Sequence, residues 1–505
     1  MNESRKTLNL DTLSALEALA LEVQHGRISQ EQLNETIKNS SVTLKAAHIN
    51  QRHCSTNALS KIKSLKLLKF LLKRIPMPIF RLAKYFKNIL LHSKLAVKRF
   101  FIRSDSKIHL PKVSEAKDFI FSEKLISDFS TINSGSTIKI LLAVPWLDRG
   151  GSSHHLSAVF QNLSDKNIHV TVIATHPDRN KDLWNGFDLY ESFSTQIFDL
   201  NSIEGKLTQD AFFEELIKQL KPDIVLIVGS RYVYEKLGLI KTILPKCSVI
   251  DHLYNTEGHV SSNREFSQYI DFNIVANSDV KDKLIQLGEA ESKIKVILHG
   301  IDTKKFYNKN NKSIHTLKNG SSTFGFIGRF SEEKRPEDFI KFLSHKPGTH
   351  GIMCGSGPLK VDVILKSIQL VLSSRLFFCT PEDCLDFYKA IDFLIVPSRI
   401  EGLPLVVLEA MALEIPCIAA QVGAIPTVIS DGVNGYLYKS GNLNQLLEKV
   451  DLLSNLSLEE LIQMKAKARK TIVDHFDVLT CTNSYYDTFI TIASTLQNSS
   501  RQTLV

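Results

Sequence analysis

The sequence predicts an α/β protein with two doubly wound, Rossmann-like domains, preceded by a helical basic N-terminal region. From about Ser136 onward, short β-branched runs alternate with amphipathic segments, which is the pattern of parallel βαβ units. The alternation stops at the polar stretch NKNNKSIHTLKNGSS and then restarts. We therefore expect two domains of similar construction, joined by a linker at residues 308–321.

The first domain is predicted over residues 137–307. Its strands are expected in TIKILLAV, IHVTVIAT, DIVLIVG, CSVIDHL, DFNIVAN and IKVILHG. The segment RGGSSHHLSAVFQNL is typical of a glycine turn entering a helix, and we expect His154 and His155 on the surface of that helix. Further helices are predicted over residues 209–220 and 280–287.

The second domain is predicted over residues 322–475. Its strands are expected in TFGFIG, HGIMC, RLFFC and DFLIVPS. Residues 476–505 are expected to form a C-terminal helix and tail. Before the first domain, residues 1–105 form the predicted helical N-terminal region and residues 106–136 a linker.

Two carboxylates flank an apolar run in SRIEGLPLVVLEAMALEIP. Gly402 and Pro404 predict a turn, followed by a helix over residues 405–413. Glu401 then lies at the mouth of this helix, and Glu409 lies one to two turns inside it. The residues expected in the core are Val406, Val407, Ala410 and Met411.

Composition places the chain among globular proteins. Its 505 residues, 43% of them hydrophobic, suffice for two or three domains with cores. The seven cysteines are scattered without a Cys-x-x-Cys pair, which favours a reducing compartment and argues against a zinc module. Acidic residues stand where a signal peptide would be apolar, and no apolar run reaches the roughly 18 residues of a membrane-spanning helix. We expect a cytoplasmic protein.

The basic charge of the chain is concentrated in one segment. Residues 61–103 carry thirteen Lys and Arg and no Asp or Glu, whereas the whole chain has a net charge of +9. KIKSLKLLKFLLKRI plots as a helix with leucines on one face and lysines on the other. A docked helical hairpin could explain this pattern. The lack of interleaved acids favours peripheral association with the anionic inner face of a membrane. Nucleic acid is not expected, because no zinc-finger or RNA-binding signature accompanies the segment.

Open α/β sheets bind ligands at the carboxyl ends of their strands. Cations, glycine turns and a helix N-terminus at these ends suit a diphosphate, and nearby acids suit hydroxyl groups. Together these features predict a nucleotide-sugar site. The residues at these positions are Gly150, Gly151 and His252 in the first domain, and Arg329, Glu332, Lys334, Gly355, Gly357 and Glu401 in the second.

The ordered motifs resemble the retaining glycosyltransferases of family 4, whose GT-B fold has two facing Rossmann-like domains. EGLPLVVLEAMA is similar to their Glu-x7-Glu motif. The resemblance runs from about residue 139 to residue 476. It includes GG at 150–151, HGID at 299–302, GRFSEEKRP at 328–336, CGSGP at 354–358 and DGVNGYLY at 431–438.

The resemblance implies a role for each matching residue. Arg329 and Lys334 would hold the donor diphosphate and stabilise the leaving group. Glu409 would bind the ribose hydroxyls, Glu401 would bind hydroxyls of the transferred sugar, and His252 would lie near the reacting carbon. Donor contacts are further implied for Gly150, Gly151, Gly328, Gly355, Gly357, Gly402, Leu403, Pro404 and Leu405.

Structural alternatives exist for several of these residues. His252 could merely hydrogen-bond a backbone group, Glu409 could be an exposed helix acid, and Gly355 and Gly357 could only shape a turn. Arg329 could pair with Glu332, Glu333 or Asp338.

One position departs from the family pattern. The chain reads GAIPT where the family often has Gly-Gly-x-Pro-Glu, so Thr427 replaces an acid and no acidic contact is implied there.

The implied reaction is retaining transfer of a sugar from a nucleotide-diphosphate sugar to a glycan or lipid-linked acceptor, in surface polysaccharide or lipopolysaccharide biosynthesis. Front-face attack, in which the leaving phosphate helps to deprotonate the acceptor, needs no protein base. The chain has no Asp-x-Asp, so we expect no metal and no cofactor. Two other functions stay open: a non-catalytic membrane-associated subunit with a degenerate transferase domain, and another GT-B enzyme such as a nucleotide-sugar epimerase.

Overall fold

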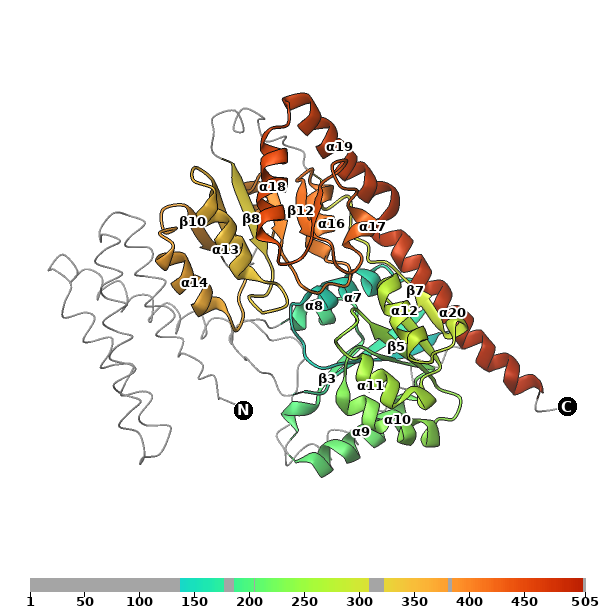
Figure 1. Cartoon of the computed structure of the whole chain (residues 1–505). Helices are drawn as coiled ribbons and strands as arrows, with labels where there is room; N and C mark the ends of the chain where they lie inside the picture. Colours follow the sequence, from blue (N-terminus) through green and yellow to red (C-terminus); the bar gives the residue numbers. More distant parts are fainter. Residues whose placement is uncertain (1–136, 177–185, 204, 308–321, 380–383, 503–505) are drawn as a thin grey trace, which may run out of the picture. The chain divides into compact units, whose positions relative to one another are not determined.

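The computed structural model describes residues 137–176, 186–203, 205–307, 322–379 and 384–502 (Figure 1). The predicted basic segment 61–103 and the linkers 106–136 and 308–321 lie outside these residues. The described parts of Pro111–Gly357 and Phe377–Val505 form one compact unit. Pro358–Leu376, with α14 (Lys360–Gln369), belongs to another unit.

The first domain contains a seven-stranded sheet in which all pairs are parallel. The strand order is β3-β2-β1-β4-β5-β6-β7, so the winding direction reverses between β1 and β4. Such a switch point opens a crevice at the carboxyl ends of the strands. The strands are β1 (Ile138–Val144), β2 (Ile168–Ala174), β3 (Gln196–Asp199), β4 (Ile224–Ile227), β5 (Ser248–Leu253), β6 (Phe272–Val275) and β7 (Ile294–Val296).

Helices cover both faces of this sheet. Leu142 packs in a cluster with Val159 of helix α7, whereas its neighbour Leu141 packs in a different cluster with Phe213 of helix α9. Because successive strand residues point to opposite faces, both faces are buried. The helices are α7 (Gly151–Gln161), α8 (Phe187–Glu191), α9 (Lys206–Leu220), α10 (Arg231–Ile243), α11 (Val260–Glu265) and α12 (Ser278–Gln286), with 3-10 turns at Leu200–Ser202, Ser267–Tyr269 and Glu291–Lys293.

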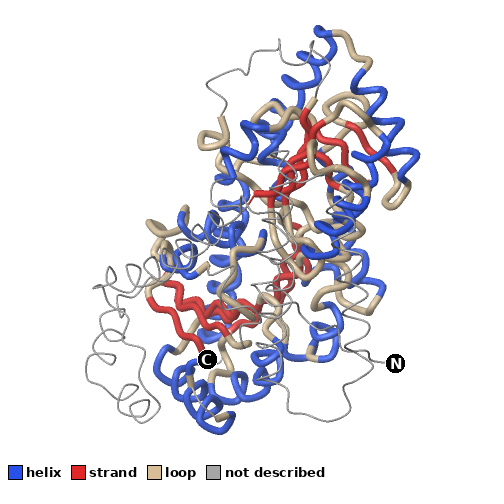
Figure 2. Tube along the Cα trace, turned by 90° about the vertical axis from the view of Figure 1, so that its left-hand side faces the viewer, coloured by secondary structure: helices blue, strands red, loops and turns tan. Residues whose placement is uncertain are grey.

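The second domain repeats this plan around a six-stranded sheet. Its order is β10-β9-β8-β11-β12-β13, with the switch point between β8 and β11. Figure 2 shows the strands of each sheet running together with helices beside them. The strands are β8 (Thr323–Ile327), β9 (His350–Cys354), β10 (Leu376–Cys379), β11 (Phe393–Val396), β12 (Cys417–Ala420) and β13 (Tyr436–Tyr438). The helices of the compact unit are α13 (Pro336–His345), α15 (Cys384–Ala390), α16 (Leu405–Ala412), α17 (Ile425–Val428), α18 (Leu443–Ser454) and α19 (Leu458–His475).

The last helix returns to the first domain. Helix α20 (Val478–Gln502) places Tyr485 and Phe489, both fully buried, in the same apolar cluster as Phe160 of α7. At its start, the N–H of Val478 donates to the carbonyl of Ile301, over 2.9 Å. The first turns of α20 are therefore part of the core of the first domain.

The predicted fold class is confirmed, with two corrections of detail. His155 was expected on the surface of its helix but is fully buried, because it faces α20 and β5; His154 is exposed as predicted. Helix α16 ends at Ala412, one residue early, and Val406 is only partly buried. No helix among the described residues is long and apolar enough to cross a membrane.

Candidate functional site

Lys334 and Glu401 form a largely buried ion pair at the carboxyl ends of the second sheet. The Nζ of Lys334 lies 2.7 Å from each carboxylate oxygen of Glu401, whose side chain is 6% exposed. The hydroxyl of Ser398 donates to the same carboxylate over 2.7 Å. Lys334 follows β8 and Glu401 follows β11, so the switch point of the sheet brings them together. The sequence predicted both residues but not their contact.

Arg329 lies in the turn after β8 with its side chain 56% exposed. Its guanidinium Nη2 is 3.7 Å from Oδ2 of Asp148, which lies in the glycine turn before α7. Asp148 also accepts a hydrogen bond from the hydroxyl of Ser153, over 2.6 Å. Asp338, one of the alternative partners considered for Arg329, instead accepts from Arg335. The long contact and the exposure leave the guanidinium of Arg329 accessible to a ligand.

Glu409 lies inside α16 and is partly buried rather than exposed. The hydroxyl of Tyr388 donates to its Oε2 over 2.6 Å. Desolvation raises the pKa of the Glu409 carboxyl above its ordinary value, and the Tyr388 hydrogen bond and the charge of Lys305 oppose that shift. A carboxylate held in this way has acceptor capacity left for further hydroxyl groups.

The glycines of the second domain permit close packing of its turns. A Cβ on Gly355 would lie 2.0 Å from the carbonyl oxygen of Gly328, and one on Gly357 would lie 2.6 Å from that of Phe330. Both glycines have φ near +150°, which L side chains rarely adopt. Their role in shaping the turns therefore has direct support, and their contact with a donor stays a prediction.

The turn before α16 packs against the first domain. A Cβ on Gly402 would lie 2.1 Å from the carbonyl oxygen of Tyr254, which follows β5. Leu403 is buried, and its carbonyl accepts a hydrogen bond from His299 Nδ1 over 2.7 Å. Pro404 precedes α16 and Leu405 begins it, so the first helical turn, whose backbone N–H groups lack partners within the helix, starts four residues after Glu401.

The three predicted positions in the first domain differ in accessibility. Nothing lies within 4 Å of a Cβ placed on Gly151, and the nearest atoms to a Cβ on Gly150 belong to the side chain of Asp148, at 3.3 Å and beyond. His252, by contrast, is 1% exposed, and its Nε2 lies 3.2 Å from the hydroxyl of Tyr485. Burial lowers the pKa of His252 to about 3. Contact between its imidazole and a sugar would require the surrounding cluster to open, and its catalytic role stays a prediction.

A cavity of about 210 Å³ adjoins Glu401. Its volume is below the roughly 300 Å³ of a typical small-molecule site, so it could admit one sugar ring but not a whole nucleotide sugar. The first domain contributes Thr256, Glu257, Asn277 and Asp279 to its lining, and the second contributes Arg399, Ile400, Glu401, Val422 and Gly423.

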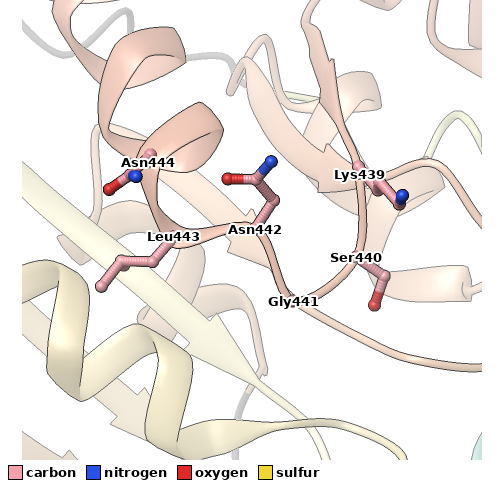
Figure 3. A pocket seen from close by; sticks show the side chains of 6 residues that line it. All are labelled: Lys439, Ser440, Gly441, Asn442, Leu443 and Asn444. Carbon is pink, nitrogen blue, oxygen red and sulfur yellow. The ribbon is translucent and has the colours of Figure 1, made fainter.

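A larger hollow, of about 440 Å³, lies at the loop between β13 and α18 (Figure 3). It is lined by residues 439–444, and Asn442 in this loop caps α18 by accepting from the N–H of Gln445. None of the residues predicted for the site lines it. We therefore place the site at Glu401, where ion pair, cavity and glycine turn coincide.

Three residues that contact predicted site residues were missed in the sequence: Asp148, Tyr388 and Ser398. The residues that line the cavity beside Glu401 were not predicted either. Asp148 stands two residues before the GG turn, Tyr388 begins YKAIDFLIVPS, and Ser398 precedes the Glu401 turn. Their positions in recognised motifs were a signal. The contacts of Asp148 with Arg329 and of Tyr388 with Glu409 span 21 or more residues, however, so no local spacing could identify these two contacts.

Comparisons with known proteins give a consistent result. Residues 308–471 match the family model described as glycosyl transferases group 1. D-inositol 3-phosphate glycosyltransferase of Mycobacterium marinum is 28% identical over 209 residues, which is 39% of this chain and 45% of that protein. The enzyme of the same name from Mycolicibacterium smegmatis is 29% identical over 177 residues, 32% of this chain and 41% of that protein. The chain thus spans less than half the length of these curated relatives.

Solved structures share the fold over a longer span. HepE of Anabaena, in complex with UDP-glucose, superposes with a TM-score of 0.59 at 19% identity, covering 72% of this chain and 100% of that one. The apo form of the lipopolysaccharide outer core galactosyltransferase WaaB gives a TM-score of 0.54 at 18% identity, covering 70% and 99%. The chain therefore has the GT-B fold, and its second domain is similar to the glycosyl transferases of group 1.

Proposed function

We propose that the protein is a retaining glycosyltransferase of the family 4 type, which transfers a sugar from a nucleoside-diphosphate sugar to a glycan or lipid-linked acceptor. The observation that carries the proposal is the Lys334–Glu401 pair, whose lysine lies in the same segment after β8 as the exposed Arg329. Two cations and a carboxylate at the switch point of a parallel sheet suit a ligand with a diphosphate at one end and hydroxyls at the other.

Lys334 can serve both ends of such a donor. Its ammonium group has three N–H donors, and the carboxylate of Glu401 engages at most two of them. The remaining N–H is available for a phosphate oxygen. Glu401 would then orient the hydroxyls of the transferred sugar while its charge stays balanced by Lys334.

Glu409 supports the nucleotide end of the assignment. Its position in α16 follows Glu401 by eight residues, which is the spacing of the Glu-x7-Glu motif. With Oε2 held by Tyr388, the carboxylate would accept hydrogen bonds from ribose hydroxyls at its other lone pairs. The UDP-glucose complex of HepE, a protein of the same fold, supports a nucleotide sugar as the donor class.

The chemistry follows from charge separation. As the bond between the sugar carbon and the phosphate oxygen breaks, negative charge grows on the diphosphate, and Arg329 and Lys334 would stabilise it. The leaving phosphate would take the acceptor proton, so the reaction needs no protein base. We propose no catalytic metal and no cofactor, since the two cations would supply the charge that a metal supplies elsewhere.

The acceptor would enter from the first domain. Thr256, Glu257, Asn277 and Asp279 line the cavity at Glu401 and offer oxygens and an amide to hydroxyl groups. The name of WaaB, a lipopolysaccharide outer core galactosyltransferase of the same fold, supports a glycan or lipid-linked acceptor, whereas the D-inositol 3-phosphate enzymes are named for a small phosphorylated polyol. We propose a cytoplasmic enzyme, bound peripherally to the inner face of the membrane through residues 61–103.

A panel of nucleotide sugars tests the proposal. The full-length protein should release nucleoside diphosphate from one donor, and NMR of the product should show the anomeric configuration of that donor. Inversion of the configuration would refute the retaining mechanism. Absence of turnover together with absence of donor binding by calorimetry would favour a degenerate subunit, and interconversion of free nucleotide sugars would favour an epimerase.

A further inference from the structure

Three buried histidines meet in the compact unit although they are far apart in the chain. His155 lies on α7, His252 on β5, and His299 follows β7; they are 0%, 1% and 4% exposed. One ring nitrogen of each lies within 4.8 Å of one ring nitrogen of the other two. The ring centroids of His155 and His299 are only 4.1 Å apart.

Each ring is held at one nitrogen and unpartnered at the other. His299 Nδ1 donates to the carbonyl of Leu403 over 2.7 Å, whereas its Nε2 has no partner among the described residues. The Nε2 atoms of His155 and His252 bond the hydroxyl of Tyr485, at 3.0 and 3.2 Å. Their Nδ1 atoms, which are buried, have no partner within the same part of the chain.

The hydrogen bonds at the edge of the cluster leave its centre without partners. The Tyr485 hydroxyl oxygen has two lone pairs and can accept from the Nε2–H of both His155 and His252, while His299 donates through Nδ1. The other nitrogen of each ring then presents a bare lone pair without a partner among the described residues. Each buried polar atom left without a partner costs about 1–3 kcal/mol, so something is expected to occupy the centre of the cluster.

We propose that His155, His252 and His299 bind one divalent transition-metal ion, with Zn²⁺ as the best match to three imidazole ligands. Three histidines are an established zinc ligand set. The scattered cysteines argued against a cysteine-based zinc module, and that argument does not extend to histidines that folding brings together. The hydroxyl of Tyr254 is also buried and unpartnered among the described residues, and its ring centroid is 4.2 Å from that of His252.

The geometry of the cluster needs little change to bind an ion. Zinc–nitrogen bonds of about 2.0–2.1 Å require each nitrogen of a triangle with 4.8 Å sides to move inward by less than about 1 Å. Metal-bound histidines usually donate their other N–H to a carbonyl or similar oxygen, as His299 does to Leu403.

The ion would have a structural role outside the donor chemistry. It would tie α7 and β5 to the segment after β7, and through Leu403 and Tyr485 it would reach the Glu401 turn and α20. A metal on His252 would also exclude the imidazole from contact with a sugar, so it would rule out the role near the reacting carbon that the family resemblance implies for this residue. Metal content is measured without donor or acceptor, so the site can be tested separately from the proposed transferase activity.

Metal analysis of the full-length protein, purified from zinc-supplemented cells, tests the site. We expect about one Zn²⁺ per chain in the unaltered protein and in the control His169→Gln, which alters a half-buried histidine of β2 outside the cluster. His155→Gln and His299→Gln should each lose the ion, with circular dichroism confirming that they fold. Zinc far below one per chain in the unaltered protein, or unchanged zinc in both folded variants, would overturn the proposal.

A cobalt spectrum tests the ligand set without any substitution, in case the variants fail to fold. Replacing zinc with Co²⁺ in the unaltered protein should give the intense visible bands of a four-coordinate site with nitrogen ligands. Weak bands typical of six-coordinate Co²⁺, or no bound cobalt after dialysis, would contradict a three-histidine site.

Discussion

At the scale of single residues, Lys334 and Glu401 are interdependent in a way that Arg329 is not. Lys334→Ala would leave the buried Glu401 carboxylate with Ser398 as its hydrogen-bond donor. We expect a loss of about 2 kcal/mol in the free energy of unfolding, less than for a fully buried pair because Lys334 is 28% exposed. Arg329→Ala, at an exposed position, should change it by less than about 0.5 kcal/mol.

Urea unfolding of the two variants measures this difference. In the double variant Lys334→Ala/Glu401→Gln, part of the stability should return, because the uncompensated charge is removed. Equal free energies of unfolding for Lys334→Ala and Arg329→Ala would show that the Lys334–Glu401 pair does not stabilise the fold.

Substitution of Glu401 and of Glu409 should change different kinetic constants. Glu401→Gln removes charge next to the transferred sugar and next to Lys334, so we expect mainly a lower kcat. Glu409→Gln weakens the acceptor for the ribose and should mainly raise KM for the donor. Tyr388→Phe, which removes the hydrogen bond to Glu409, should resemble the second variant in milder form. Steady-state kinetics with varied donor concentration distinguishes the two patterns, and identical profiles would refute the division of roles.

The residues of the site could be predicted in part from the sequence. Glu401, Lys334 and Arg329 stand out because charges follow directly after buried strands. The contact of Arg329 with Asp148 and the burial of His155 could not be predicted, because both depend on elements more than 90 residues apart. The sequence of α7 alone does not indicate that α20 will cover its His155 side chain.

At the scale of elements, alanine substitutions in two glycine turns distinguish a glycine needed for packing from one needed for contact with the donor. Gly402→Ala would force its Cβ into the carbonyl of Tyr254, so we expect a melting temperature lower by several degrees together with a loss of turnover. Gly151→Ala meets no atom within 4 Å and begins α7, so stability should be unchanged or slightly higher. If donor phosphates approach this turn, turnover should still fall.

Thermal denaturation and turnover, measured on the same preparations of both variants, distinguish a packing role from a role in donor contact. Normal turnover in Gly151→Ala would remove that glycine from the donor site. A stable Gly402→Ala variant would contradict the close packing of the turn against Tyr254.

The long buried strands were the easiest elements to predict. The runs at β1, β2 and β8 are apolar and bounded by turns, so their period and ends are readable. The short strands β3, β12 and β13 were not recognised. Helix α10 was also missed; its buried face is Val233, Tyr234, Leu237 and Ile240. In β3 no residue is fully buried, so its sequence lacks an apolar run.

At the scale of the whole molecule, the prediction that residues 61–103 bind an anionic membrane is independent of the described fold. Each Lys or Arg near such a surface contributes about 1 kcal/mol, screened beyond about 8 Å at physiological salt. Replacing Lys63, Lys66, Lys69 and Lys73 with Glu should therefore release the protein from anionic vesicles. In a control variant with the same change of charge, four exposed lysines outside this segment are replaced with Glu: Lys218, Lys341, Lys389 and Lys470.

Vesicle co-sedimentation at low and high salt measures this binding. The unaltered protein and the control should bind at low salt and dissociate at high salt. Failure of the unaltered protein to bind at any salt concentration would favour the docked hairpin.

The most direct test of the donor site is the release of nucleoside diphosphate by Arg329→Ala, with the donor that the unaltered protein accepts. The control is Arg231→Ala, which removes an arginine of similar exposure on α10. We predict that Arg329→Ala lowers turnover about 100-fold, as the loss of some 3 kcal/mol of transition-state stabilisation requires, and that the control turns over normally. Near-normal turnover in Arg329→Ala would contradict the assignment of the diphosphate to this site.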